Sequence, residues 1–183
     1  MIKKITLILS LVVISIIGWA GKKETAPELG TNIGNLAPEI ALKNPNDSII
    51  KLSSLRGKVV LIDFWGSWCV PCRISHPALK ELYEQYKSKG FEIIGISNEI
   101  ANSNRDKKKQ DIAWRKAVKE DGLSWPQILY DPAIKDIVKE YDINGYPTKF
   151  LVDQNGKFVM RILGNSERLH AELAAKLASL MPD

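Results

Sequence analysis

Residues 59–72 of this chain read Val-Val-Leu-Ile-Asp-Phe-Trp-Gly-Ser-Trp-Cys-Val-Pro-Cys, and this stretch decides the fold class. Its first seven residues, 59–65, are mostly apolar, which predicts a strand buried on both faces. Apolar positions spaced three and four apart then predict a helix over residues 73–87. Cys69 and Cys72, the only two cysteines of the chain, therefore lie where a buried strand leads into a helix.

The position of the two thiols predicts thiol–disulfide exchange. The start of a helix presents unpaired backbone N–H groups and the positive end of the helix dipole, and both favour the thiolate form of a cysteine. The thiolate is the nucleophile in disulfide exchange, and a second thiol one helical turn away can resolve the mixed disulfide. We therefore expect Cys69 and Cys72 to be a redox-active pair.

Three other roles for the cysteine pair remain open from the residues alone. A structural disulfide between them would close a loop of only four residues, and such a loop stabilises a fold by roughly 2 kcal/mol before strain. A copper-binding carrier would use Cys69, Cys72 and His76, which share one helical face, whereas a structural zinc site would need a fourth ligand. The third alternative is a pair that maintains the fold and carries no reaction.

Composition and charge narrow the class of protein. The 183 residues are 45% hydrophobic and 26% charged, which is typical of one globular domain with a short leader. The net charge is +5, and removing Lys3 and Lys4 with the leader would leave +3, which is too small to indicate a nucleic-acid partner. We therefore expect no nucleic-acid partner.

The start of the chain predicts a targeting segment. Two lysines precede an apolar run at residues 5–20, which ends in the small-x-small pattern Gly18-Trp19-Ala20 of a signal-peptidase site. The run is too short for a typical span, because a helix of this length rises only about 24 Å against a hydrocarbon core of about 30 Å. A cleaved signal peptide over residues 1–21 is therefore favoured over an N-terminal membrane anchor. Either leader predicts an extracytoplasmic location, the bacterial periplasm or cell envelope, where disulfides persist.

The rest of the chain predicts one α/β domain over residues 34–183, preceded by a linker at residues 22–33. Residues 39–42 and 48–52 alternate polar and apolar side chains around a turn, which predicts an N-terminal β-hairpin. A second buried strand follows the first helix, and this succession implies parallel pairing. The predicted elements from there on are the strand 91–96, an excursion at 97–126 with a helix at 110–121, a strand at 128–130, a helix from Asp131 and Pro132 to Tyr141, a hairpin of strands 149–153 and 157–163, and a helix from Ser166 to Leu180. Trp114 and Trp125 flank the helix of the excursion, either as packing or as a grip on a substrate.

This order of elements, together with four motifs, resembles the thioredoxin fold over residues 34–183. The motifs are Asp63-Phe64-Trp65, Trp68-Cys69-Val70-Pro71-Cys72, Pro77 and Gly145-Tyr146-Pro147-Thr148. The early hairpin and the helical insert at about 97–126 resemble the TlpA/ResA-like group of extracytoplasmic thiol-disulfide oxidoreductases, placed with the AhpC/TSA–redoxin superfamily. The resemblance implies a central mixed β-sheet with helices on both faces.

The resemblance also implies the catalytic residues. By it, Cys69 is the attacking cysteine, Cys72 is the resolving one, and Asp63 is the buried acid that moves a proton to or from Cys72. The alternative for Asp63 is a structural acid with satisfied hydrogen bonds. No metal or other cofactor is implied beyond the redox-active disulfide itself.

The residues expected to contact substrate come from the same comparison. Pro147 matches the cis-proline that faces the disulfide, and its neighbours Tyr146 and Thr148 complete that turn. Trp65 and Trp68 match the aromatic rim of the site, with simple packing as the alternative. A proline at this turn removes a backbone donor, so the main chain beside it can pair with an extended substrate.

Some positions depart from the group's pattern. The group often has Glu where this chain has Ser75, and many members have Asn where it has Asp63. Tyr146 is bulkier than the usual residue before the cis-proline, which would narrow the choice of substrate. We expect His76 to be an exposed helical histidine, the alternative being a charged histidine that supports the thiolate.

Taken together, the sequence predicts an extracytoplasmic enzyme that reduces protein disulfides through Cys69 and Cys72. The resemblance implies a DsbD/CcdA-like membrane electron donor, and a role in cytochrome c maturation or in general repair. Two alternatives are a thiol peroxidase of the AhpC/TSA superfamily and the copper-binding carrier. The peroxidase would need a Thr-x-x-Cys nucleophile site, where this chain has Gly66-Ser67-Trp68-Cys69.

Overall fold

Strand β3, Val59–Trp65, lies at the centre of the fold and is buried along its whole length, as its apolar sequence predicts. The computed structural model describes residues 28–46, 48–100, 103 and 106–181. Side chains alternate along a strand, so those of β3 enter two separate apolar clusters. Val60, Ile62 and Phe64 pack into one cluster, whereas Val59, Leu61 and Trp65 pack into the other. Asp63 shares the parity of this second set.

Five strands form one mixed sheet in the order β5-β4-β3-β6-β7. The other four are β4 (Phe91–Ser97), β5 (Gln127–Leu129), β6 (Thr148–Val152) and β7 (Phe158–Leu163). β3 pairs parallel with β4 and antiparallel with β6, which confirms the predicted strand–helix–strand unit. In this register Asp63 lies directly opposite Lys149 of β6.

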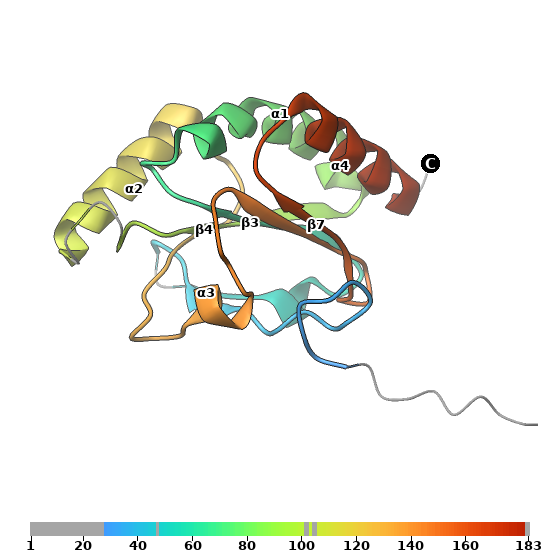
Figure 1. Ribbon diagram of the computed structural model, residues 1–183, viewed down its shortest axis with the longest axis horizontal. Coiled ribbons are helices and arrows are strands. Elements are labelled where there is room, and N and C mark those ends of the chain that lie inside the picture. Colours follow the sequence, from blue (N-terminus) through green and yellow to red (C-terminus); the bar gives the residue numbers. More distant parts are fainter. Residues whose placement is uncertain (1–27, 47, 101–102, 104–105, 182–183) are drawn as a thin grey trace, which may run out of the picture.

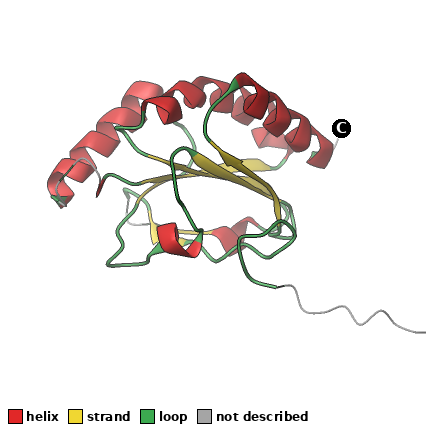
Figure 2. Cartoon of the chain, in the orientation of Figure 1, coloured by secondary structure: helices red, strands yellow, loops and turns green. Residues whose placement is uncertain are grey.

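The sheet is covered on both faces (Figures 1 and 2). Three long helices lie together on one face: α1 (Val70–Tyr86), α2 (Lys107–Asp121) and α4 (Glu167–Leu180). The opposite face carries the short helix α3 (Ile137–Glu140) and the hairpin of β1 (Ala41–Lys43) and β2 (Ile49–Lys51). Two 3-10 turns, η1 (Leu52–Leu55) and η2 (Lys87–Lys89), follow β2 and α1. The predicted thioredoxin fold, with its N-terminal hairpin and helical insert, is confirmed.

Capping side chains set where the long helices begin. Helix α1 starts at Val70 rather than at Arg73, because Cys69 is its N-cap. Helix α2 starts at Lys107, three residues before the predicted Gln110, because the carboxylate of Asp106 accepts hydrogen bonds from two backbone N–H groups of its first turn. The predicted cap of the last helix is confirmed, since the Ser166 hydroxyl accepts from the backbone N–H of Leu169.

The helix predicted from Asp131 to Tyr141 is wrong in its first half. Residues 132–134 form a turn, in which the Asp131 carboxylate accepts from the backbone N–H of Ala133 at 3.1 Å. Helix α3 begins only at Ile137, because Asp136 acts as a second cap and accepts from the Lys139 N–H. Aspartate competes with helical hydrogen bonding in this way, and two such residues five positions apart shorten the helix to one turn.

The predicted leader, residues 1–21, lies outside the described residues, as do residues 22–27 of the predicted linker. The remaining part of that linker contacts the domain, since Glu28 accepts at its carbonyl from the Leu36 N–H at 2.8 Å. Over the stretch that the structure describes, no helix is both long enough and apolar enough to cross a membrane.

Candidate active site

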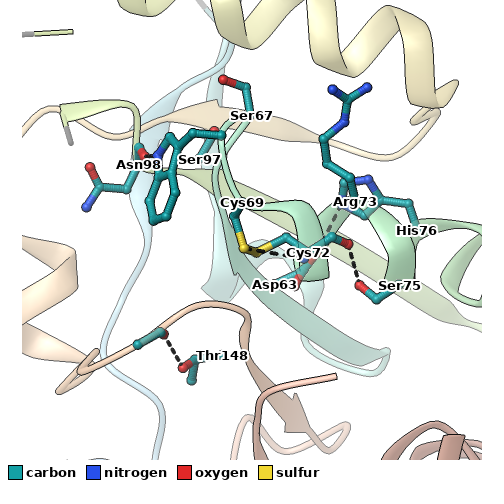
Figure 3. Close-up of a disulfide and its surroundings, with 12 residues drawn as sticks. Asp63, Ser67, Cys69, Cys72, Arg73, Ser75, His76, Ser97, Asn98 and Thr148 are labelled. Atoms are coloured by element: carbon teal, nitrogen blue, oxygen red, sulfur yellow. Dashed lines mark hydrogen bonds and ion pairs between the residues drawn. A yellow bond between two sulfur atoms is a disulfide. The ribbon is translucent and has the colours of Figure 1, made fainter. Parts of the chain in front are cut away.

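Cys69 and Cys72 form a disulfide at the N-terminus of α1, with their sulfur atoms 2.04 Å apart (Figure 3). The Cys69 sulfur also accepts a hydrogen bond from the Cys72 backbone N–H at 3.3 Å. Cys69 is 4% exposed and Cys72 is 0% exposed, so Cys69 is the less deeply buried of the two residues. The neighbouring Val70 is 65% exposed, so the approach to Cys69 runs over an apolar surface. The attacking role of Cys69 and the resolving role of Cys72 stay predictions.

The loop between β3 and the cysteines is held by a buried carboxylate that the sequence did not indicate. Glu99, 1% exposed, follows β4 and accepts from the Ser67 backbone N–H at 2.7 Å and from the Ser67 hydroxyl at 2.5 Å. The Ser97 hydroxyl donates to the same carboxylate at 2.6 Å. Because these hydrogen bonds satisfy the buried charge, Glu99 fixes the path of the chain into Cys69.

The predicted rim residues Trp68 and Tyr146 lie against one another. Their ring centroids are 5.5 Å apart in an edge-to-face arrangement. Asn98 joins them, since its carbonyl accepts from the Trp68 indole N–H and its side-chain amide donates to the Tyr146 hydroxyl, both at 2.7 Å. Burial raises the pKa of Tyr146, although the hydrogen bond from Asn98 opposes this. Trp65 is different, because it is fully buried and contributes packing rather than rim surface.

The turn before β6 brings the expected proline to the same end of the sheet. The peptide bond between Tyr146 and Pro147 is cis, as the resemblance implied. Thr148 pairs with Phe64 in the β3–β6 register, so this turn lies beside the end of β3 that leads into the cysteines. The Thr148 hydroxyl donates to the Gly145 carbonyl at 2.7 Å, which closes the turn (Figure 3).

Asp63 is buried below the disulfide (Figure 3). It faces a lysine that the sequence analysis had not singled out. Asp63 is 1% exposed and Lys149 is 2% exposed. The Lys149 ammonium lies 3.1 Å from Asp63 Oδ1 and donates to the Ser75 hydroxyl at 3.2 Å. The Ser75 hydroxyl in turn donates to the Cys72 carbonyl at 2.6 Å. A carboxylate, an ammonium and a hydroxyl thus form a buried polar cluster beside the inner cysteine.

The expectation of an exposed His76 is wrong. His76 is 1% exposed, because it lies on the same face of α1 as Cys72, Ser75 and Leu79, at the spacing of three and four that faces the sheet. Its Nδ1 is 2.7 Å from Asp121 Oδ2, and its Nε2 is 3.9 Å from Asp63 Oδ2. The ring therefore lies between two carboxylates, one on β3 and one at the end of α2.

Asp121 is also held by Arg73 of α1. The guanidinium donates to both carboxylate oxygens, with the shortest contact at 2.6 Å. Burial by itself would raise the pKa of Asp121, but hydrogen bonds from Arg73 and His76 lower it below its usual value. Those same contacts with Asp121 raise the pKa of Arg73 above its usual value. Asp121 is therefore a carboxylate at neutral pH and accepts from both neighbours.

The two tryptophans of the excursion pack in the core. Trp114 is 2% exposed and Trp125 is 3% exposed, and both belong to the cluster beneath α1, α2 and α4. The Trp125 ring lies 6.4 Å from that of His76 and 5.7 Å from that of Tyr83, both edge-to-face. Packing, not a grip on substrate, is therefore their role in this structure.

Among the described residues, no cluster of three or more histidines, cysteines or acids is placed to hold a metal ion. Cys69, Cys72 and His76, the ligands of the copper alternative, are likewise not arranged as a metal site. The two ring nitrogens of His76 face Asp121 and Asp63.

Known proteins resemble this chain over the whole domain as well as at the site. Residues 32–177 match the family model described as Redoxin. A protein of Bacillus anthracis called thiol-disulfide oxidoreductase ResA is 36% identical over 150 residues, which cover 82% of this chain and 79% of that protein. The Bacillus subtilis protein of the same name is 33% identical over 131 residues, covering 72% of this chain and 67% of that protein.

Solved structures give the same result. The thioredoxin domain of a thiol-disulfide oxidoreductase from Bacteroides vulgatus superimposes with a TM-score of 0.67 at 33% identity, covering 80% of this chain and 98% of that one. A thiol-disulfide oxidoreductase from Bacteroides fragilis gives a TM-score of 0.63 at 31% identity, covering 78% of this chain and 100% of that one. The likeness therefore covers nearly all of the described domain.

Proposed function

The chain belongs to the redoxin family and is a ResA-like thiol-disulfide oxidoreductase of the thioredoxin superfamily, and from this premise we propose that it reduces disulfide bonds of proteins outside the cytoplasm. The observation that carries the proposal is the Cys69–Cys72 pair at the N-terminus of α1, in which Cys69 is 4% exposed and Cys72 is fully buried. This arrangement suits a two-step exchange in which Cys69 attacks the substrate first and Cys72 then attacks Cys69.

In the first step, the Cys69 thiolate attacks one sulfur of a substrate disulfide. The substrate's S–S bond breaks, a mixed disulfide forms, and the other substrate sulfur leaves as a thiolate. In the second step, Cys72 loses its proton and attacks the Cys69 sulfur, which releases the second substrate thiol. The substrate gains two electrons and two protons, and the enzyme is left with the Cys69–Cys72 disulfide.

We assign the second proton to Asp63. Its carboxylate is buried below Cys72 (Figure 3) and is held in place by the Lys149 ammonium, which lies 3.1 Å away. A base inside the protein is needed at this point, because the inner thiol has no contact with bulk water once a substrate covers Cys69.

The substrate surface of this proposal combines the cis-Pro147 turn with the aromatic rim. The backbone beside Pro147 pairs with an extended segment of the substrate, while Trp68 and Tyr146 pack on its side chains. Thr148 fixes the turn through its hydrogen bond to Gly145. The Trp68–Asn98–Tyr146 contacts give this surface a defined shape, which favours particular substrates over unfolded chains in general.

The oxidised pair must be reduced again for turnover, and no cofactor beyond the two cysteines is part of the proposal. We assign this step to a DsbD/CcdA-like membrane electron donor. The charged and apolar pattern of residues 1–21 supports export or anchoring at the cell envelope. Maintaining the haem-attachment cysteines of c-type cytochromes in reduced form is one such task, and repair of oxidised envelope proteins is another.

The experiment that tests the proposal is insulin reduction with a chemical reductant in excess, comparing the protein with its Cys69→Ser and Cys72→Ser variants. We expect Cys69→Ser to be inactive and Cys72→Ser to accumulate the mixed disulfide. Retained turnover by Cys69→Ser would contradict the proposal. Peroxide-dependent turnover faster than insulin reduction would instead support the thiol peroxidase.

A further inference from the structure

We propose that His76 carries protons between Asp63 and the surface carboxylate Asp121, so that these three side chains form a proton path behind the resolving thiol of Cys72. The inference rests on the proposed exchange reaction and deepens it, because it says how the proton taken by the buried acid leaves the protein. In this role His76 is a positioning residue, since it acts on the reacting thiol through Asp63.

The inner end of the path is a pair of buried groups that face each other. His76 and Asp63 are both 1% exposed, and Nε2 of the ring lies 3.9 Å from Oδ2 of the carboxylate. Within the described part of the chain, His76 Nε2 has no hydrogen-bond partner. Buried polar atoms are rarely left in this state, and such atoms call for an explanation in terms of function. The two groups lie just beyond hydrogen-bond distance, so the proposed transfer requires one side chain to move toward the other.

The outer end of the path fixes the tautomer of the ring. Asp121 is held as a carboxylate by Arg73, so the contact of 2.7 Å with His76 has Nδ1–H as its donor. Nε2 then carries the lone pair, and this lone pair points toward Asp63. Asp121 thus orients the ring so that Nε2 can accept a proton from Asp63. This is the arrangement of a base with its orienting acid.

Charged groups from four elements surround the ring. Asp63 on β3 carries the ammonium of Lys149 from β6 as its partner. On the other side, Asp121 is the last residue of α2 and is paired with Arg73 of α1. The remaining charged groups at this end are Glu120, which accepts from Arg73 at 3.1 Å, and Lys80, which donates to the Asp121 carbonyl at 3.2 Å.

Aromatic rings separate the path from bulk water along its length. Trp65 packs on the His76 ring with centroids 5.0 Å apart, and Trp125 packs on it at 6.4 Å, both edge-to-face. The exposed fraction of the Asp121 side chain is 13%, so this carboxylate is the point where the path reaches solvent. The way out for a proton therefore leads through the imidazole.

When Cys72 attacks Cys69, the Cys72 thiol proton passes to Asp63 as the new S–S bond forms and the substrate thiolate leaves. Asp63 passes that proton to His76 Nε2, and the imidazolium lies between two carboxylates. The proton on Nδ1 passes through Asp121 to solvent, where the substrate thiolate takes up a proton. Reduction of the enzyme runs through the same groups in reverse.

The test separates the two exchange steps with an aromatic disulfide, 5,5′-dithiobis(2-nitrobenzoate), whose thiolate is followed by absorbance. In a Cys72→Ser background only the first step occurs, and with both cysteines present the second thiolate reports resolution. We expect His76→Asn, which keeps a donor toward Asp121 but has no group at the Nε2 position, to slow resolution by roughly tenfold or more and to alter its pH profile. The first step should stay within about twofold of the parent protein.

His170→Asn is the matched control, because His170 is the only other histidine of the chain and lies on α4, outside the path. Burial and the charge of Lys149 lower the pKa of His170, so it is neutral at neutral pH and its replacement leaves the charge near Lys149 unchanged. The control should match the wild-type protein in both steps.

A folded His76→Asn variant with unchanged resolution and pH profile would overturn the proton path, as would equal slowing of both steps. If that variant does not fold, the wild-type protein provides the test. Its resolution step should be slower in D₂O than in H₂O, whereas its attack step should not. A resolution rate that is equal in the two solvents would also overturn the path. Absence of any exchange by the wild-type protein would instead overturn the proposed function, so the two failures are distinguishable.

Discussion

Replacing Lys149 by methionine should destabilise the oxidised protein more than almost any other single change on β6. Lys149 is 2% exposed, and its ammonium lies 3.1 Å from the carboxylate of Asp63, which is 1% exposed. Methionine keeps most of the side-chain volume but leaves Asp63 buried with no cation beside it on β6. Breaking a buried ion pair by removing one partner costs about 3–5 kcal/mol.

This cost is large against a total stability of about 5–15 kcal/mol for a natural domain. For a chain of this size, each kcal/mol shifts Tm by about 2–4 °C, so Lys149→Met should lower Tm by about 6–20 °C. Urea unfolding of the oxidised protein, followed by tryptophan fluorescence, gives the free energy directly.

The matched control is the double variant Asp63→Leu with Lys149→Met. Replacing both members of a buried pair by apolar residues is often neutral or stabilising by about 1–4 kcal/mol, so the double variant should recover the stability that the single one loses. A loss below about 1 kcal/mol in Lys149→Met, the value of an exposed pair, would refute the reasoning, because it would mean that Asp63 is solvated or uncharged.

Three further predictions follow from other contacts. Glu99→Ala should cost about 1–3 kcal/mol and slow insulin reduction, because the Ser67 N–H loses its acceptor, and Glu99→Gln, measured in parallel, should lose less. Burial alone would raise the pKa of Asp121, but hydrogen bonds from Arg73 and His76 lower it below its usual value. The stabilisation from Asp121 is therefore fully present above the usual pKa of an aspartate and is lost as pH falls through the lowered pKa. Asp121→Asn should accordingly flatten the acid limb of stability against pH, measured by urea unfolding, and an unchanged limb would contradict this. Leu173→Ala should lower the free energy of unfolding by about 2–5 kcal/mol, because Leu173 is 1% exposed on the inner face of α4. An alanine substitution on the exposed face of α4 should cost little in the same assay.

Much of the fold was predictable because its signals are local. The apolar run of β3, the alternation of the hairpin and the Ser166 cap each act within a few residues, and each prediction is confirmed. The pairing of β3 with β4 followed from the strand–helix–strand order. The cis bond before Pro147 was different in kind, since only the resemblance to a family indicated it.

The parts of the site that were missed depend on contacts between distant segments. Lys149 was placed in a strand but given no partner, because nothing local says that it lies opposite Asp63. Glu99 follows a strand in a polar segment and has no local sign of burial. Each of these charges is stable inside the protein only because a partner from another element meets it there.

The burial of His76 was predictable from its position in the sequence. It lies four residues after Cys72 and three before Leu79, so helical spacing places it on the buried face of α1. The expectation of an exposed histidine followed its polar chemistry instead of its position. Its burial between Asp63 and Asp121 is the reason that it now has a proposed role.

The reduction potential of the Cys69–Cys72 couple tests the central claim most directly. Equilibration in a thiol redox buffer, with alkylation of free thiols and mass analysis, gives the oxidised fraction at each ratio. The account predicts a value near or below about −230 mV, which places the protein with the reducing members of the superfamily. A value near about −120 mV would mark a strong oxidant and would contradict the proposed direction of electron flow.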